Sequence, residues 1–260
     1  MVIDVVDNDF DPDLNLDPTT ANTACSGCSV PANAPLVNNS DGTFNYTPGT
    51  GSAGSDMFVY EVCDTDGLCD TATVTINIDP AGFTMLEVRV GASSDDAEER
   101  SFGSVKLNSS DLELGFDKNT AQTVGVRFTG ITIPQGATIT SAWIQFQADE
   151  TDNVFTDLTI WAQAADNPGT FTNNSGNITG RPLTNASAAW SPLAWNIIGE
   201  AGPAQQTPDL SALIQEVVGG SLWTDNAIVF IISGTGVRTA EAYDGFPNGA
   251  PLLHIEYTTG

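Results

Sequence analysis

Apolar and polar residues alternate along most of this chain, in short segments that Gly, Pro and Asp separate. In the first third the alternation is clear in GTFNYTP (42–48), DMFVYEVCD (56–64) and TATVTINID (71–79). A period of two residues is typical of half-buried antiparallel strands, because successive side chains of a strand point to opposite faces of the sheet. Short strands at close spacing predict a β-sandwich for this part of the chain.

A longer series of strand-like segments follows, and its clearest member is TITSAWIQFQAD (138–149). One helix is expected in TPDLSALIQEVVGG (207–220), where Thr207 can cap the first turn and Pro208 suits the first helical position. The other predicted strands are 85–90, 104–107, 123–133, 157–166, 227–233 and 251–258. This pattern predicts a jelly-roll β-sandwich with one short helix at an end or flank.

The two series meet at Asp79-Pro80-Ala81-Gly82, where the strand pattern breaks. Residues 1–81 hold twelve Asp and one Glu but no Lys or Arg, whereas the remainder holds twenty acids and all seven basic residues. Because both pattern and composition change here, we expect two all-β domains, 1–80 and 83–260.

The net charge of −26 limits the partners of the protein. Nucleic acid and anionic membranes would repel such a chain, so cations are the expected partners, although scattered surface acids also serve solubility. No apolar run approaches the roughly 20 residues of a membrane helix, so we expect no membrane insertion. The start Met1–Asp4 lacks the features of a signal peptide, and we expect a processed or excised piece of a longer secreted or cell-surface protein.

All four cysteines lie in the first third: Cys25, Cys28, Cys63 and Cys69. Four thiolates could hold zinc in a closed tetrahedral site. Polar, loop-like flanks and an extracellular type of composition favour disulfides instead. Of the three possible connectivities we favour pairing within each short loop, Cys25 with Cys28 and Cys63 with Cys69.

The motifs of residues 2–79 resemble a known family. VVDNDFDPD is followed in order by SDGTFNYTP, GSDMFVYE, an Asp-rich turn and TATVTINI. This order resembles the cadherin-like, bacterial immunoglobulin-like repeats of large secreted adhesins, which implies an immunoglobulin-like β-sandwich. Such repeats usually begin with another strand, which is missing before Met1. Either the chain was cut inside a domain, or a strand from another chain or segment completes the sandwich.

The same resemblance implies a calcium site in the first domain, because loop carboxylates of this kind coordinate calcium in the family. Four residues fall on the matching positions: Asp7, Asp9, Asp11 and Asp13. Ca²⁺ takes about six to eight oxygens, so it can hold together carboxylates that otherwise repel one another. A solvated turn is the alternative. Asp64, Asp66 and Asp70 either add ligands or only build their own turn.

Residues 85–258 are similar to jelly-roll modules of secreted bacterial proteins that are akin to carbohydrate-binding modules. The matching stretches include SSDDAEE, IPQGATITSAWIQFQADE and GTGVRTAEAYDG. The resemblance implies a spacer or sugar-binding role, and often a structural calcium between an early loop and the last hairpin. The candidate ligands are Asp95, Asp96, Glu98, Glu99, Asp111 and Asp244. Pairing with arginines is the alternative, and for Arg238 we expect a salt bridge to Glu241 or Asp244.

Aromatic residues give a second candidate site. Trp190 and Trp195, in the loop-like AAWSPLAWN, could stack on a sugar ring, although large aromatics are more often core. The single His254 lies in an alternating terminal strand, where we expect a structural role.

Enzymatic chemistry finds little support, since the sequence has no nucleophile elbow, phosphate loop or metal-hydrolase helix. We therefore predict a non-enzymatic, calcium-binding structural or adhesive segment of a bacterial cell-surface or extracellular protein. The alternatives are a carbohydrate-binding module whose partner is a glycan, and a self-assembling filament subunit whose partners are neighbouring copies of itself.

Overall fold

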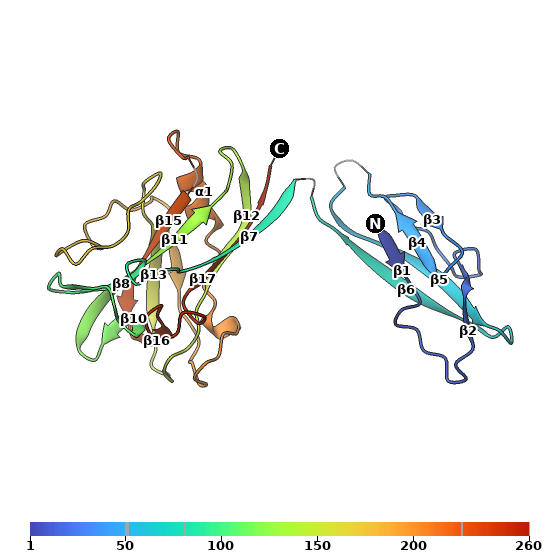
Figure 1. Ribbon diagram of the computed structural model, residues 1–260, viewed down its shortest axis with the longest axis horizontal. Helices are drawn as coiled ribbons and strands as arrows, with labels where there is room; N and C mark the ends of the chain where they lie inside the picture. The colour runs from blue at the N-terminus through green and yellow to red at the C-terminus, as the bar shows by residue number, and fades with distance from the viewer. Residues whose placement is uncertain (50–51, 81, 225, 260) are drawn as a thin grey trace. The chain divides into compact units, whose positions relative to one another are not determined.

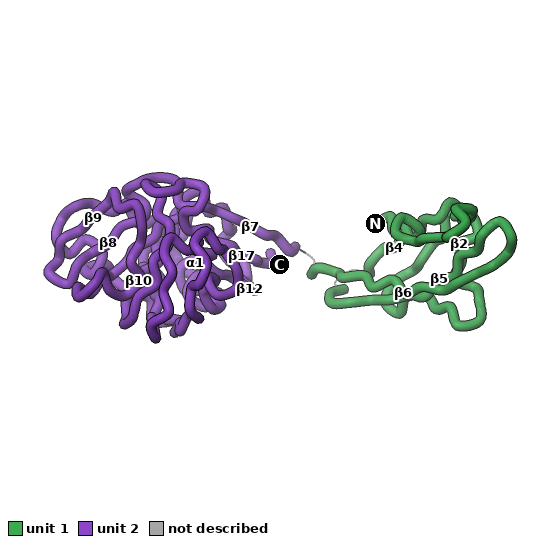
Figure 2. The backbone as a smooth tube through the Cα atoms, turned by 90° about the horizontal axis from the view of Figure 1, so that it is seen from below, with its two compact units in different colours: residues 1–81 green, residues 82–260 purple. Residues whose placement is uncertain are grey.

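The computed structural model describes residues 1–49, 52–80, 82–224 and 226–259. The chain divides into two compact units, Met1–Ala81 and Gly82–Gly260, which Figure 2 colours separately. The expected break at 79–82 includes Ala81, which lies outside the described residues. Strands dominate both units and pair antiparallel (Figure 1), so the predicted all-β class is confirmed.

Unit 1 is a sandwich of two three-stranded sheets, ordered β1-β4-β3 and β2-β5-β6. Phe44 from the first sheet packs against Phe58 from the second, with ring centroids 5.5 Å apart. Both rings occupy apolar positions of the two-residue pattern, so the core follows directly from the sequence. The strands are β1 (Val2–Asp4), β2 (Leu16–Asn22), β3 (Leu36–Asn38), β4 (Thr43–Tyr46), β5 (Gly54–Asp64) and β6 (Cys69–Ile78).

Unit 2 packs an eight-stranded sheet against a three-stranded one. The larger sheet runs β14-β13-β15-β11-β10-β16, with β8 paired to β11 and β9 paired to β8. The smaller sheet runs β12-β17-β7. Alternate residues of β11 and β12, such as Phe128 and Ile144, are fully buried in one core between the sheets.

The strands of unit 2 are β7 (Phe83–Arg89), β8 (Asp96–Arg100), β9 (Val105–Lys106), β10 (Asp111–Asp117), β11 (Thr120–Ile131), β12 (Thr138–Gln145), β13 (Asp157–Ala162), β14 (Ala188–Trp190), β15 (Asn226–Thr235), β16 (Val237–Glu241) and β17 (Leu252–Thr258). A short 3-10 helix, η1 (Pro203–Gln205), precedes the single α-helix.

The α-helix α1 (Ser211–Val218) contacts β12 and β13, so it covers a flank of the sandwich as expected. The prediction that Thr207 caps this helix is wrong. Thr207 Oγ1 accepts the Ile144 N–H at 2.9 Å, and Asp209 Oδ1 accepts the Ala142 N–H at 3.0 Å. These bonds tie the preceding segment to the edge of β12, which delays the first helical turn. Among the described residues, no helix has the length and apolarity needed to cross a membrane.

Trp190 and Trp195 lie in the core of unit 2. Trp195 is fully buried and its indole N–H donates to a backbone carbonyl at 2.9 Å. Trp190 is 5% exposed and stacks on Phe146, with ring centroids 5.7 Å apart. The placement contradicts the prediction that these rings form a sugar platform. Their segment is loop-like in sequence, but β14 pairs with β13, and the backbone of Trp195 bridges to Asp152, which turns both rings inward.

Replacement of Trp195 tests this core role. We expect Trp195→Ala to lower the free energy of unfolding of unit 2 by about 3–5 kcal/mol, because the loss of a large buried side chain leaves a cavity. Denaturant unfolding followed by tryptophan fluorescence measures the change, since all five tryptophans lie in unit 2.

The matched control is Leu193→Ala, two residues away. The Leu193 side chain is 74% exposed, so we expect a change within about 0.5 kcal/mol. Equal effects of the two substitutions would contradict the core assignment.

Candidate functional site

A surface pocket of about 420 Å³ in unit 1 gathers acids from two segments that are far apart in the sequence. The loop between β1 and β2 supplies Asp9, Asp11 and Asp13, and the β5–β6 hairpin supplies Asp64 and Asp70. We call this feature, defined by these five carboxylates, the acidic pocket. Its lining also includes apolar side chains, namely Phe10, Leu16, Val62, Leu68 and Ala72.

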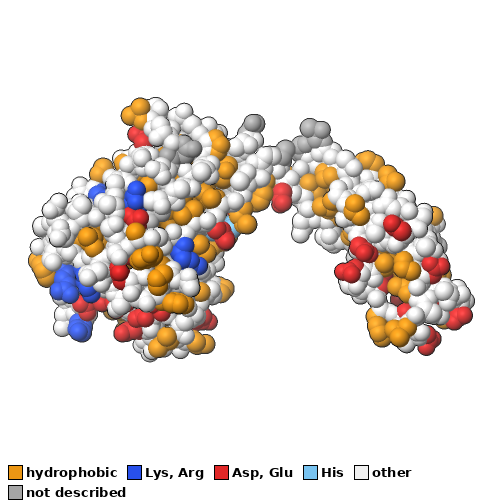
Figure 3. Space-filling view, in the orientation of Figure 1, with side chains coloured by type: hydrophobic (Ala, Val, Ile, Leu, Met, Phe, Trp, Pro, Cys, Tyr) orange, Lys and Arg blue, Asp and Glu red, His pale blue; other side chains and the backbone are white. Residues whose placement is uncertain are grey.

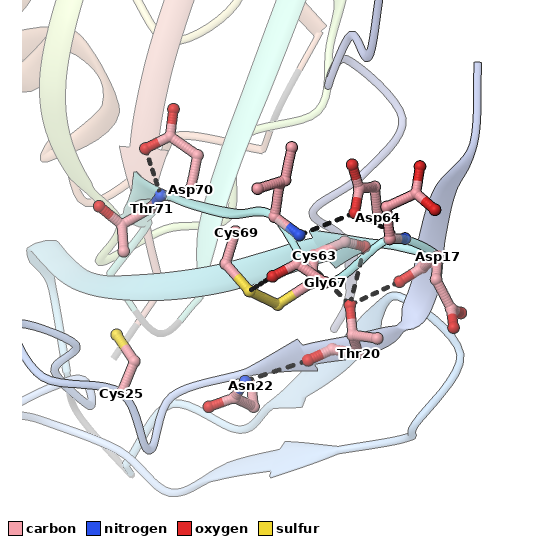
Figure 4. Close-up of a disulfide and its surroundings, with 12 residues drawn as sticks. Asp17, Thr20, Asn22, Cys25, Cys63, Asp64, Gly67, Cys69, Asp70 and Thr71 are labelled. Carbon is pink, nitrogen blue, oxygen red and sulfur yellow. Dashed lines mark hydrogen bonds between the residues drawn. A yellow bond between two sulfur atoms is a disulfide. The ribbon is translucent and has the colours of Figure 1, made fainter. Parts of the chain in front are cut away.

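A disulfide fixes the hairpin that carries Asp64 and Asp70. Cys63 and Cys69 are bonded where β5 passes into β6 (Figure 4). Asp64 Oδ1 accepts the backbone N–H groups of Asp66 and Leu68 at 2.9 and 2.8 Å, which holds the turn between the strands.

The second disulfide joins Cys25 and Cys28, so the favoured pairing of the cysteines is confirmed. All four thiols are consumed, and none remains as a zinc ligand.

Four carboxylates of the acidic pocket use one oxygen each within the protein. The Tyr60 hydroxyl donates to Asp9 Oδ2 at 2.7 Å, and burial together with this bond raises the pKa of Tyr60. Asp11 Oδ1 accepts the Asp13 N–H at 2.7 Å, and Asp70 Oδ1 accepts the following N–H at 2.7 Å. Among the described residues, the second carboxylate oxygen of Asp9, Asp11, Asp64 and Asp70 accepts no hydrogen bond. Free carboxylate oxygens without a neighbouring base fit a hard cation such as Ca²⁺.

The structure brings together only part of the predicted set. Asp7 and Asp66 do not line the acidic pocket, whereas Asp64 and Asp70, whose role the sequence left open, do. Within the described ranges, one group of three metal-ligating atoms lies within 4.8 Å of one another, and it consists of Glu61, Cys63 and Cys69. Its two sulfurs form the disulfide, so it is no metal site. In the described part of the chain, no three carboxylate oxygens from different residues of the acidic pocket lie that close together, so the aspartates line one pocket without forming a closed coordination sphere.

In unit 2, two predicted ligands bond within the protein. For Asp95 the partner is an arginine, which is the alternative that the sequence left open. Asp95 Oδ1 lies 2.8 Å from the Arg127 guanidinium. Glu99 Oε2 accepts the N–H groups of Ile178 and Thr179 at 2.7 and 2.9 Å. The Glu99 bonds hold the loop after β13 against β8.

Asp96 and Glu98, on the other face of β8, meet further acids. Each is 3% exposed. Glu98 Oε1 accepts the backbone N–H of Glu113 on β10 at 2.7 Å, so the two acidic segments do come together. Asp96 Oδ2 accepts the N–H of Tyr243 at 2.7 Å, beside the predicted ligand Asp244.

Burial, together with neighbouring acids, shifts the pKa values of two of these carboxyl groups. Burial raises the pKa of Asp96 to about 7, and the charges of Asp244 and Asp95 add to the rise. Burial and the neighbouring Glu98 raise the pKa of Glu113 to about 9.

Sequence reasoning missed two members of this cluster, Asp149 and Glu241. Glu241 pairs across the strands with Asp111, and burial followed by the charge of Asp149 raises its pKa. The alternation of β16 was the available signal, because it places Glu241 and Thr239 on one face.

Alternation also explains why the expected salt bridge of Arg238 is wrong. Arg238 and Glu241 are three residues apart on β16 and therefore point to opposite faces. The guanidinium is buried and donates to backbone carbonyls of Val154, Pro192 and Leu193. His254 has the expected structural place, stacked on Trp143 with ring centroids 3.8 Å apart.

Residues 1–77 match the family model of the bacterial Ig domain. The resemblance of unit 1 to bacterial Ig-like repeats is confirmed. The Ig-like unit carries the acidic pocket and both disulfides. Comparison with curated protein sequences finds no match.

Solved structures similar to the chain contain carbohydrate-binding modules. One describes modules of the β-sandwich superfamily, at 9% identity over 83% of this chain and 78% of that chain, with a TM-score of 0.25. Two describe ZmpB of Clostridium perfringens. The first, CBM51-2 in complex with GlcNAc together with INT domains, has 15% identity over 79% of this chain and 38% of that chain, with a TM-score of 0.21.

The second shows the M60 catalytic domain of ZmpB with CBM51-1 and CBM51-2, at 14% identity over 88% of this chain and 20% of that chain, with a TM-score of 0.21. The chain thus spans less than half the length of the two ZmpB structures. TM-scores of this size support no conclusion about a ligand or a site.

The buried acids of unit 2 predict how its stability depends on pH in metal-free solution. The folded-state pKa values of about 7 for Asp96 and about 9 for Glu113 exceed the ordinary values of 3.8 and 4.5. Between these values the folded protein binds more protons than the unfolded one, so stability falls as pH rises. We expect the melting temperature of unit 2 to decrease from about pH 5 to about pH 9 in chelator.

Glu113→Gln should flatten the upper part of this decrease, because it removes the group with the highest of these pKa values. Glu150→Gln, at an exposed position, is the control and should leave the slope unchanged. A melting temperature that rises with pH would contradict the assignment.

Proposed function

We propose that this chain is a calcium-stabilised, non-enzymatic structural or adhesive segment of a bacterial cell-surface or extracellular protein. The observation that carries the proposal is the acidic pocket, in which two separate segments of unit 1 direct five carboxylates to one opening.

The negative charge of unit 1 is not balanced by Lys or Arg side chains of the same unit. Residues 1–81 contain twelve Asp and one Glu but no Lys or Arg, and Figure 3 shows acidic side chains without basic ones on the visible face of this unit. Ionised carboxylates at close range destabilise one another. A divalent cation removes that repulsion and uses the oxygens that Asp9, Asp11 and Asp64 leave free.

A cation in the acidic pocket would connect the β1–β2 loop to the β5–β6 hairpin. Asp9, Asp11 and Asp13 would bind from one side, and Asp64 and Asp70 from the other. The hairpin is already fixed by the Cys63–Cys69 disulfide, so the ion would immobilise the loop against a rigid partner. A stiffened end suits a structural repeat. The ion would supply charge neutralisation and cross-linking, and no chemical step.

Two further observations support the location and the lack of catalysis. Disulfides persist in oxidising compartments, and unit 1 contains two of them. The match of residues 1–77 to the bacterial Ig domain supports a structural or binding role.

Calorimetric melting in Ca²⁺ and in chelator tests the proposal. A ligand at 100 times its dissociation constant stabilises the folded state by about 2.7 kcal/mol, and each kcal/mol raises the melting temperature of a domain this small by about 4–8 °C. We therefore expect the transition of unit 1 to move up by roughly ten degrees or more in excess Ca²⁺.

The variant Asp11→Asn with Asp64→Asn removes one charge from each side of the acidic pocket. Both asparagines keep the Oδ1 acceptor that holds the local turn, so we expect the calcium shift to disappear without loss of the fold. Asp79→Asn removes an exposed charge outside the acidic pocket and should keep the shift. Melting curves of the unaltered protein that coincide with and without calcium would overturn the proposal.

A further inference from the structure

The seven basic residues of this acidic protein fall into two classes, and all of them lie in the described part of unit 2. Four have guanidinium groups that bond within the protein: Arg89, Arg127, Arg181 and Arg238. The other three side chains are exposed, namely Arg100, Lys106 and Lys118. Two of these also have a protein partner, since Lys106 Nζ donates to Ser109 Oγ at 2.9 Å and Arg100 forms an ion pair with Asp117. They belong to the adjoining β8–β9 and β10–β11 hairpins, and Figure 3 shows basic side chains gathered at the end of unit 2 where Figure 1 places β8 and β10.

Two of these exposed bases line a pocket of about 500 Å³, which we call the β8–β9 pocket. Arg100 and Lys106 supply positive charge, while Ser104, Asn108 and Asn173 supply hydroxyl and amide groups. None of the described residues that line it is acidic. A pocket with two bases and no acid is unusual in a chain of 33 acids and 7 bases. Such a lining favours an anionic ligand that is rich in hydrogen-bonding groups.

Local backbone geometry forms the pocket in advance. The Arg100 N–H donates to the Ser104 carbonyl at 2.9 Å, and the Gly103 N–H donates to the Arg100 carbonyl at 2.7 Å. Gly103 has a φ of +88°, and a Cβ atom there would collide with Ser175 Oγ. Glycine therefore lets the hairpin dock on the loop of Ser175, where the Gly103 carbonyl accepts the Gly176 N–H at 3.2 Å. Because the loop that contains Ser175 lies against the hairpin, Asn173 of the same loop lines the β8–β9 pocket.

An exposed aromatic ring lies at the tip of the same hairpin. Phe102 is 69% exposed. It lies in sequence between Arg100 and Ser104, which line the pocket, but is not itself a lining residue. An exposed flat ring on the hairpin that supplies hydroxyl and amide groups to the pocket matches a sugar ring, which has an apolar face and a polar rim. A small inorganic anion would need the two charges but not the ring.

We propose that the β8–β9 pocket binds an acidic polysaccharide. Phe102 stacks on a sugar ring, Arg100 and Lys106 bind its carboxylate or sulfate group, and the neighbouring Ser and Asn side chains bind hydroxyls. The net charge of the protein does not prevent this, because screening limits exposed charges to a range of about 8 Å at physiological ionic strength. The β8–β9 pocket shares no residue with the acidic pocket, so a negative result for polysaccharide binding leaves the calcium proposal unaffected.

Isothermal titration calorimetry of the full chain with defined hexasaccharides tests the site. The probes are a uronic-acid hexamer, a sulfated hexamer and a neutral hexamer. We expect at least one acidic hexamer to bind about tenfold or more tighter than the neutral one, since hydrogen bonds between charged groups are stronger than those between neutral groups. The acidic hexamer that binds identifies the group that Arg100 and Lys106 recognise.

Variants distinguish binding in this pocket from general electrostatic attraction to the exposed bases. Arg100→Gln with Lys106→Gln, and separately Phe102→Ala, should each weaken binding of the acidic hexamer about tenfold. Lys118→Gln removes an exposed base outside the pocket and should change affinity less than twofold. Equal losses for Lys118→Gln and the double variant would overturn the proposal, as would a failure of both acidic hexamers to bind.

A gain in affinity provides a test that misfolding cannot imitate. Asp117 Oδ2 lies 3.6 Å from Arg100 Nη2 and partly neutralises it. Asp117→Asn should therefore tighten binding of the acidic hexamer severalfold and leave the neutral one unchanged. Unchanged or weaker binding of the acidic hexamer would count against a role for Arg100.

Discussion

Repulsion between carboxylates is the constraint on which the rest of unit 1 depends. The sandwich folds around apolar residues such as Phe44 and Phe58, but its loops carry acids that have no base in their own unit. Backbone N–H groups and the Tyr60 hydroxyl bind one oxygen of several carboxylates. They position these groups without removing the charge. Burial of apolar residues therefore decides the fold, whereas in our proposal an added cation decides how rigid its charged end becomes.

Unit 2 meets the same constraint in a different way. Asp95 is paired with Arg127, and Glu99 is held by N–H groups of a loop. Asp96 also accepts a backbone N–H, but burial raises its pKa and that of Glu113, so protons take the place of counter-ions. The repulsion between neighbouring acids is thus reduced in three ways in the two units, namely by pairing with arginine, by protonation and, in our proposal, by a metal ion.

Patterns of period two allowed most of the fold to be predicted. They located strands such as β5, β6, β11 and β15, but not β2, β8, β10 or β16. The short spacing of the cysteines led to the correct disulfides. The errors came from contacts that are distant in sequence. Thr207 was expected as a helix cap but bonds to β12, and Trp195 lies in a loop-like segment that folds into the core.

The candidate sites were predicted less completely, for the same reason. Asp9, Asp11 and Asp13 were recognised from one motif, whereas the contribution of Asp70 depends on how the β5–β6 hairpin meets the first loop. Asp149 and Glu241 could not be linked to Asp111 before the strand register was known.

A high-resolution crystallographic map of the protein in millimolar Ca²⁺ tests the central claim most directly. The account predicts an ion in the acidic pocket, bound by aspartate oxygens from both the β1–β2 loop and the β5–β6 hairpin at about 2.3–2.6 Å. Density that fits only water between these carboxylates would contradict it.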